Sequence, residues 1–117
     1  MDEKFSPQQR IRKKKDFLFL YRKGKRYRGK YFSLIYLANN LSSSRIAIVA
    51  SKKVGNAVKR NKIKRWMREL FRRNKNLLNK PMDIVIIPKK DIADLSWSAL
   101  QKEYLEAIAH ISSQNSI

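Results

Sequence analysis

The sequence contains no cysteine and a single histidine, His110. It therefore provides no disulfide, thiolate zinc site or cysteine nucleophile, and one histidine cannot form a histidine metal cluster. The carboxylates of Asp83, Asp91 and Asp94 are scattered and are interpreted as turn or capping groups. No segment reaches the roughly 18 apolar residues of a membrane span, and Met1–Arg12 lacks the apolar run of a signal peptide. These absences predict a soluble, cytoplasmic protein without catalytic residues or a tightly bound metal, in which His110 is a surface residue.

Acidic residues are also scarce, since 9 Asp and Glu stand against 28 Lys and Arg and leave a net charge of +19. The length of 117 residues fits one domain, and 43% apolar residues are enough for a core. Such a basic domain needs an acidic partner, and nucleic acid is the first candidate. We expect a single domain over residues 1–117, in which residues 1–13 form a basic arm that either contacts RNA or is mobile in the free protein.

The positive charge lies in two separate segments. Residues 1–30 carry a net charge of +9 and residues 52–75 carry +10, whereas residues 31–51 carry +1 and residues 76–117 carry −1. Both basic segments are interleaved with aromatic and aliphatic residues, unlike a disordered basic tail. The pattern therefore predicts basic faces on two folded elements.

Apolar spacing predicts a first helix over residues 14–23. Its apolar residues recur at i, i+3 and i+4 from Phe17, and Gly24 is a natural stop. Residues 6–9, with proline in second place and a glutamine three positions after the serine, also have the features of a helix start.

Four segments are predicted to form strands. Residues 31–38 and 45–51 are rich in aromatic and branched residues, and we expect them to pair as an antiparallel hairpin across a polar loop. Residues 25–29 can add a short strand before that hairpin. Residues 82–88 are almost continuously apolar, which is typical of a central strand covered on both faces.

Residues 56–74 show the clearest helical period. Apolar residues recur at i, i+3, i+4, i+7 and i+8 from Ile63 and form one stripe, on which Trp66 is interpreted as core. Ser96 can cap a last helix that extends to about Ile111. The element order is α-β-β(β)-α-β-α, which predicts a single α+β domain.

The segment that indicates function is residues 51–69. A strand ends in two lysines, turns at Gly55 and Asn56, and enters a helix whose N-terminal amides and dipole favour phosphate. Positions 59–73 hold 8 Lys and Arg and one acid, without the alternating signs that stabilise an exposed helix. A solvated face is the ordinary interpretation of a charge run, but this imbalance favours nucleic acid. The predicted RNA-binding residues are Lys52, Lys53, Asn56, Lys59, Arg60, Asn61, Lys62, Lys64, Arg65 and Arg68.

Residues 52–65 read Lys-Lys-Val-Gly-Asn-Ala-Val-Lys-Arg-Asn-Lys-Ile-Lys-Arg and closely resemble the signature of the bacterial ribonuclease P protein subunit. The resemblance extends over nearly the whole chain, because the strands and the final helix fall in the family's order. The central family motif is typically Arg-Asn-Arg, whereas residues 60–62 here are Arg-Asn-Lys. Lysine keeps the charge but loses the bidentate geometry of a guanidinium, so Lys62 cannot fill a role that needs this fork.

The resemblance implies a concrete function. Ribonuclease P removes the 5′ leader from precursor tRNA, and in bacteria the catalyst is an RNA that the small basic protein assists. The family protein binds the catalytic RNA and the leader, broadens substrate specificity and improves the binding of catalytic Mg²⁺, which RNA mainly holds. The expected partners are therefore the catalytic RNA and precursor tRNA, with no membrane and no obligate protein partner.

The resemblance also implies a fold and a cleft. The family fold is an α/β sandwich whose strand–helix–strand unit around the basic helix crosses left-handedly, although general rules favour a right-handed crossover. The leader-binding cleft lies between the first helix and the sheet, where Phe17 and Tyr21 would face Ser33 and Ile35. Aromatic stacking beside cations commonly holds single-stranded RNA, whereas aromatics at helical spacing are more often core. The expected RNA contacts of the N-terminal arm are Arg10, Arg12, Lys13, Lys14 and Lys15.

Two other function classes remain open from the sequence. A structural rRNA-binding protein would have the same composition, and a protein-only nuclease would need a catalytic set that is missing here. The signature over residues 52–68 and the aromatic first helix favour the ribonuclease P interpretation.

Overall fold

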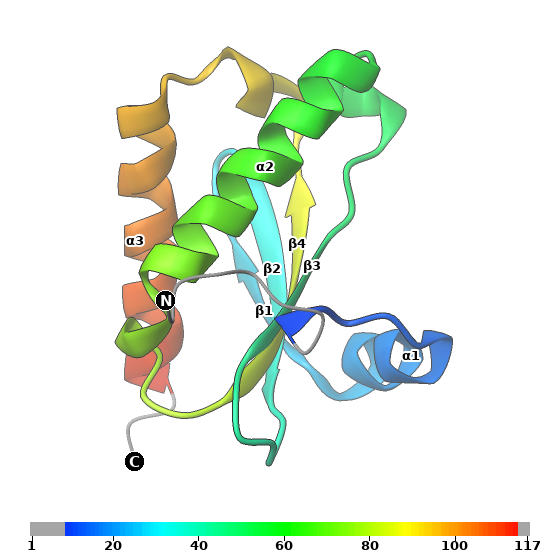
Figure 1. The fold of residues 1–117 in the computed structure, drawn as a ribbon, viewed down its shortest axis with the longest axis vertical. Helices are drawn as coiled ribbons and strands as arrows, with labels where there is room; N and C mark the ends of the chain where they lie inside the picture. Colours follow the sequence, from blue (N-terminus) through cyan, green and yellow to red (C-terminus); the bar gives the residue numbers. More distant parts are fainter. Residues whose placement is uncertain (1–8, 115–117) are drawn as a thin grey trace.

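The computed structural model describes residues 9–114, which form a four-stranded sheet and three α-helices together with short 3₁₀ helices, labelled η (Figure 1). The predicted helix start at residues 6–9 lies outside the described residues except for Gln9, as do residues 1–8 of the arm. The predicted element order is confirmed. In chain order the elements are α1 (Lys14–Lys23), β1 (Lys25–Arg28), β2 (Phe32–Ala38), β3 (Arg45–Ile48), η2 (Lys52–Val54), α2 (Ala57–Arg73), η3 (Lys75–Leu77), β4 (Met82–Pro88), η4 (Lys90–Asp94) and α3 (Trp97–Gln114).

β4 lies inside the sheet, whose strand order is β1-β2-β4-β3. It pairs antiparallel with β2 and parallel with β3. The prediction that β2 and β3 form an antiparallel hairpin is therefore wrong, because β4 separates them. Ile84, Val85 and Ile86 are at most 1% exposed, and a strand that is apolar on both faces is best buried in the interior. β3 also ends at Ile48, earlier than predicted.

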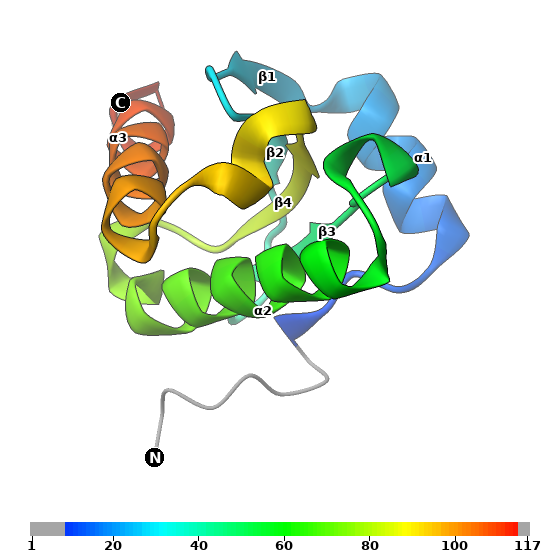
Figure 2. The ribbon, with the colours of Figure 1, turned by 90° about the horizontal axis from the view of Figure 1, so that it is seen from above.

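β3, α2 and β4 form a left-handed crossover, as the family resemblance implies. Seen from the side of α2, β3 and β4 both run upward, α2 runs back down across them, and β4 lies to the left of β3 (Figure 1). The view from above shows the same relation (Figure 2). Since about 98% of such connections are right-handed, only the resemblance predicted this feature.

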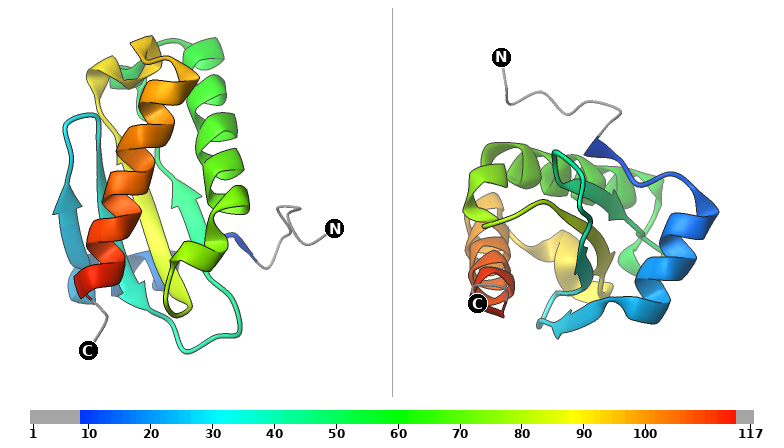
Figure 3. Two further views of the ribbon diagram at one scale, coloured as in Figure 1. Left: turned by 90° about the vertical axis from the view of Figure 1, so that its left-hand side faces the viewer. Right: turned by 90° about the horizontal axis from the view of Figure 1, so that it is seen from below.

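The main core lies on the sheet face that α2 and α3 cover (Figure 3). This core includes Leu34 of β2, Ile84 of β4, Met67 of α2 and Tyr104 of α3, and all four are at most 2% exposed. Burying each such side chain stabilises the fold by about 1.5–3 kcal/mol. The apolar stripe predicted for α2 is confirmed, and Trp66 packs half-buried against this core.

α1 covers only part of the opposite sheet face (Figure 2). Leu20, Ile35, Val85 and Ile11 form a second, smaller buried cluster there. A Cβ atom at Gly24 would lie 2.6 Å from the Leu20 carbonyl oxygen and 2.8 Å from a methyl carbon of Ile35, so a glycine allows α1 to end this close to β2. The rest of this face is left for the candidate site.

Side-chain caps set the start of two helices. The Asn56 Oδ1 accepts a hydrogen bond from the Lys59 N–H at 3.0 Å, and the Ser96 Oγ accepts one from the Ala99 N–H at 3.1 Å. α3 extends to Gln114, beyond its predicted end. Within residues 9–114, no helix is both long and apolar enough to cross a membrane.

Candidate nucleic-acid interface

The turn between β3 and α2 presents the first predicted RNA-binding residues. Lys52 and Lys53 of η2 are exposed, and Asn56 lies exposed at the start of α2. Gly55 has a φ of 139°, a conformation that other residues rarely adopt, so glycine is needed for this turn. The positive end of the α2 dipole thus lies beside two lysines, an arrangement that favours phosphate.

One flank of α2 carries a basic ridge, because residues four apart share a side of a helix. The ridge consists of Arg60, Lys64 and Arg68. The Arg60 Nη1 donates to the Gly55 carbonyl oxygen at 3.0 Å. Burial, and then the charge of Arg10, lower the pKa of Arg68. Two guanidinium groups that repel each other in this way would both be stabilised by an anion placed between them.

The outer surface of α2 is basic as well. Lys59, Asn61 and Arg65 are exposed. Glu69, the one acid of α2, accepts a hydrogen bond from the Arg72 Nε at 3.0 Å, and hydrogen bonding from Arg72 is the main cause that lowers the pKa of Glu69. Glu69 therefore offsets positive charge in the last turn of the helix. α2 has no second acid that could offset the positive charge of the ridge.

The other flank of α2 faces η4 and α3. The Lys62 Nζ donates to the Ala93 carbonyl oxygen at 3.2 Å and lies 4.5 Å from the centre of the Trp66 ring. Trp66 in turn packs edge to face against Trp97, with the ring centres 5.5 Å apart. The ammonium group of Lys62 is thus engaged by the protein itself, on the flank opposite the ridge.

A groove of about 310 Å³ lies beside this ridge. Phe17 lines it from α1, Ala47 from β3, Val49 from the residues after β3, and Arg68 from α2, while Arg10 lines it from the N-terminal segment. Phe17 is half-buried, so its ring both packs on the second core and borders the groove. The groove combines an apolar lining with guanidinium groups, which suits an unpaired nucleotide.

The other predicted cleft residues lie on the same face of the sheet. Tyr21 is 38% exposed, and its ring centre is 6.4 Å from that of Phe17. Ser33 is half-buried, pairs with Ile87 and lines a neighbouring hollow of about 300 Å³. Ile35 faces α1 but is only 1% exposed, so it supports the cleft from within the second core.

Three further basic residues at this face were not predicted. Arg26, Arg28 and Lys89 line the same hollow as Ser33. Arg26 and Arg28 are alternate residues of β1, so the two-residue period of a strand was the available signal that they share a face. The sheet face that α1 partly covers therefore has basic side chains near β1 as well as near α2.

The described part of the N-terminal arm is attached to the sheet. Arg10 forms a parallel bridge with Ile46, and the Ile11 N–H donates to the Ile46 carbonyl oxygen at 3.1 Å. The remaining predicted residues of the arm are exposed around the start of α1: Arg12, Lys13, Lys14 and Lys15.

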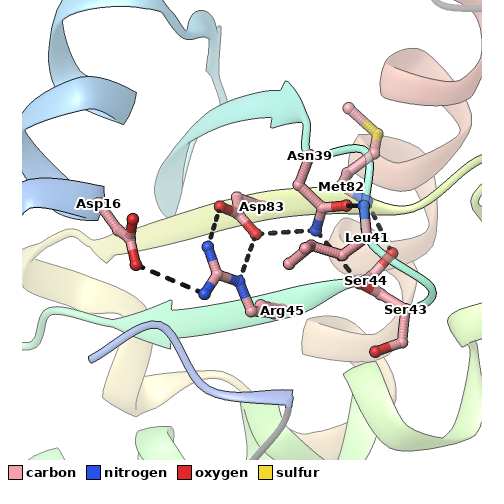
Figure 4. A network of polar contacts seen from close by, with 8 residues as sticks. All are labelled: Asp16, Asn39, Leu41, Ser43, Ser44, Arg45, Met82 and Asp83. Carbon is pink, nitrogen blue, oxygen red and sulfur yellow. Dashed lines mark hydrogen bonds and ion pairs between the residues drawn. The ribbon is translucent and has the colours of Figure 1, made fainter. Parts of the chain in front are cut away.

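No cluster of three or more metal-ligating His, Asp or Glu side chains occurs within residues 9–114. Asp16 and Asp83 both approach Arg45 (Figure 4): the Arg45 Nη2 lies 2.6 Å from the Asp83 Oδ2, and its Nη1 lies 3.5 Å from the Asp16 Oδ2. His110 is exposed on α3, as predicted, and packs against the Tyr27 ring. The carboxylates of Asp16 and Asp83 are thus both engaged by the Arg45 guanidinium group.

Comparison with known proteins decides the family. The model of the family described as Ribonuclease P matches residues 5–112. The chain belongs to the ribonuclease P protein family. Its relatives include the ribonuclease P protein component of Thermotoga maritima, which is 44% identical over 94 residues and 80% of each chain. That of Finegoldia magna is 38% identical over 105 residues, covering 90% of this chain and 92% of the relative.

Solved structures of the ribonuclease P protein family have the same fold. The Thermotoga maritima protein aligns with a TM-score of 0.79 at 36% identity, over 86% of this chain and 96% of that one. The Staphylococcus aureus protein aligns with a TM-score of 0.79 at 34% identity, over 86% of this chain and 92% of that one. The chain is thus a member of the family that forms the protein component of the enzyme processing the 5′ end of tRNA. This membership sets aside the ribosomal interpretation.

Proposed function

We propose that this chain is the cytoplasmic protein cofactor of the ribonuclease P ribozyme. It binds the catalytic RNA through α2 and the 5′ leader of precursor tRNA through the groove beside α1. The observation that carries the proposal is the junction of these two surfaces: Arg68 belongs to the basic ridge and also lines the groove, together with Arg10 of the N-terminal segment.

The charge of α2 supports its contact with the catalytic RNA. The ridge of Arg60, Lys64 and Arg68 and the exposed Arg65 can follow a phosphate backbone, and Glu69 compensates only the last turn. Neutralising phosphates releases condensed counterions, which supplies much of the affinity of such surfaces. α2 therefore holds the larger RNA without reading its bases.

The chemistry of the groove supports its contact with the leader. An unpaired base can stack on the half-buried ring of Phe17 and pack on Ala47, while guanidinium groups of Arg10 and Arg68 receive its phosphates. A paired base in a duplex has its faces covered by neighbouring bases. The groove therefore selects the single-stranded leader, a feature that precursor tRNAs share, and so broadens the range of substrates.

The described side chains support an assisting role in the reaction. Within residues 9–114 no three potential metal ligands gather, and Asp16 and Asp83 are both compensated by Arg45. We assign hydrolysis and the catalytic Mg²⁺ to the RNA subunit. The protein contributes by holding two RNA molecules together, because its positive charge offsets the repulsion between their phosphates.

Reconstitution with a bacterial ribonuclease P RNA tests this function. At low magnesium concentration, cleavage of precursor tRNA is expected to require both the RNA and this protein, whereas high magnesium restores cleavage by the RNA alone. The protein incubated with precursor tRNA in the absence of the RNA is the control and is expected to cleave nothing. A failure of the protein to stimulate the RNA at any magnesium concentration would contradict the proposal.

A further inference from the structure

A second hollow, of about 630 Å³, lies on the other flank of α1. Its wall includes Lys15 and Phe19 of α1, Arg12 of the N-terminal segment, and Asn40 and Leu41 of the loop after β2. Neither the family comparisons nor the proposed leader contact assigns a function to this hollow.

The two hollows are separated by α1 itself. Successive helical residues are rotated by about 100°, so Phe17 and Phe19 project to opposite sides of Leu20, which is buried against the sheet. Phe17 lines the groove that α2 borders, whereas Phe19 lines the second hollow. Phe19 is 51% exposed, so its ring is available to a ligand.

The bottom of the second hollow is held in place by hydrogen bonds (Figure 4). The Asn39 Nδ2 donates to the Asp83 Oδ1 at 2.9 Å and to the Ser43 carbonyl oxygen at 3.1 Å, and the Asn39 Oδ1 accepts from the Leu41 N–H at 2.8 Å. The Arg45 Nε donates to the Asp83 Oδ1 at 2.8 Å. These contacts fix the loop that carries Leu41, so this wall is formed before any ligand arrives.

The charges of the hollow favour an anionic ligand. Its two acids, Asp16 and Asp83, both pair with Arg45. The lining also contains four further cations, Arg10, Arg12, Lys13 and Lys15. Beside these cations lie the ring of Phe19 and the side chain of Leu41, which are 51% and 48% exposed. Cations next to exposed apolar and aromatic surface match the phosphate and the base of an unpaired nucleotide.

Arg10 and Arg12 line both hollows, so the two hollows adjoin at the N-terminal segment that leads into α1. From this juxtaposition we propose that the second hollow binds a further unpaired nucleotide of the same RNA strand that occupies the groove beside Phe17. The base packs on Phe19 and Leu41, and Arg12 and Lys15 hold its phosphate. The inference rests on the proposed function, and it adds a second contact farther along the leader.

The experiment measures the affinity of the reconstituted holoenzyme for precursor tRNAs whose leaders are lengthened one nucleotide at a time. The wild-type protein is expected to gain affinity in two steps, as the strand first reaches the groove and then the second hollow. Phe19→Ala is expected to lose only the second step, by about tenfold, the size of a lost stacking contact. Lys15→Ala is expected to weaken the same step, and it provides a second variant that leaves the ring in place.

Two other residues of α1 provide matched controls. Leu18 is 54% exposed and Lys23 is exposed, yet neither lines the second hollow. Leu18→Ala and Lys23→Ala are expected to keep both steps. The inference is overturned if Phe19→Ala binds every leader like the wild type, if it weakens short leaders equally, or if Leu18→Ala has the same effect. If leader length never changes the wild-type affinity, the proposed leader contact itself fails, which is a separate result.

Discussion

Arg68 of α2 and Arg10 of the N-terminal segment line the same groove, and burial, followed by the charge of Arg10, lowers the pKa of Arg68. The two basic segments of the chain thus meet at one place instead of forming independent surfaces. Like charges brought together in this way repel each other, and a phosphate bound in the groove would reduce that repulsion. The junction therefore favours RNA binding at the point where the two proposed RNA contacts adjoin.

The first prediction concerns salt. Because the ridge, the groove and the N-terminal segment together contact several phosphates, we expect the affinity for the catalytic RNA to fall by about a thousandfold between about 50 and 200 mM salt. Filter binding over that range measures the slope. A nearly flat plot of log affinity against log salt would contradict the electrostatic account.

The second prediction concerns Arg65, which is exposed on the outer surface of α2. Arg65→Ala is expected to weaken binding of the catalytic RNA about three- to tenfold and to reduce the salt slope by about 1. Lys102→Ala removes the same charge from the exposed surface of α3 and is the matched control. Equal losses for the two variants would mean that net charge matters and the position on α2 does not.

The third prediction concerns Lys62, whose ammonium bonds the Ala93 carbonyl and lies over the Trp66 ring. Lys62→Ala removes both contacts and is expected to lower the free energy of unfolding by about 1 kcal/mol. Lys59→Ala changes an exposed lysine of the same helix and is expected to have almost no effect. Denaturant unfolding measures both, and a Lys62→Ala variant as stable as Lys59→Ala would contradict the interaction.

The fourth prediction concerns Asp83, which accepts two hydrogen bonds from Arg45, at 2.8 and 2.6 Å. Asp83→Ala leaves a guanidinium that is only 20% exposed without its main partner, so we expect a loss of about 1–3 kcal/mol in the free energy of unfolding. Asp91→Ala, at an exposed position of η4, is the control. If both variants unfold at the same denaturant concentration, the half-buried pair of Asp83 and Arg45 does not stabilise the fold.

Local pattern predicted the elements better than their pairing. The stripe on α2 and the apolar run of β4 are properties of short segments, and both were predicted within a residue or two. The pairing of β4 with both β2 and β3 depends on contacts between distant residues, and a polar loop after β2 is also compatible with a hairpin. The order of the strands in the sheet was therefore the part of the fold that sequence pattern did not determine.

The candidate site was predictable to a similar extent. The cations of α2 and the aromatic residues of α1 follow from composition and helical spacing. The approach of Arg68 to Arg10 depends on the path of the N-terminal segment beside β3, which no local pattern specifies. The second flank of α1 was missed for the same reason, because Phe19 acquires a role only next to the loop that carries Leu41.

The central claim is that the groove beside α1 holds the leader, and Phe17 tests it most directly. The measurement is the affinity of the reconstituted holoenzyme for precursor tRNA and for mature tRNA, with wild-type protein and with Phe17→Ala. We expect the wild type to prefer precursor tRNA and Phe17→Ala to lose about tenfold for precursor tRNA alone, as expected for one stacked base. An equal loss for both tRNAs would contradict the claim, because mature tRNA has no leader to contact Phe17.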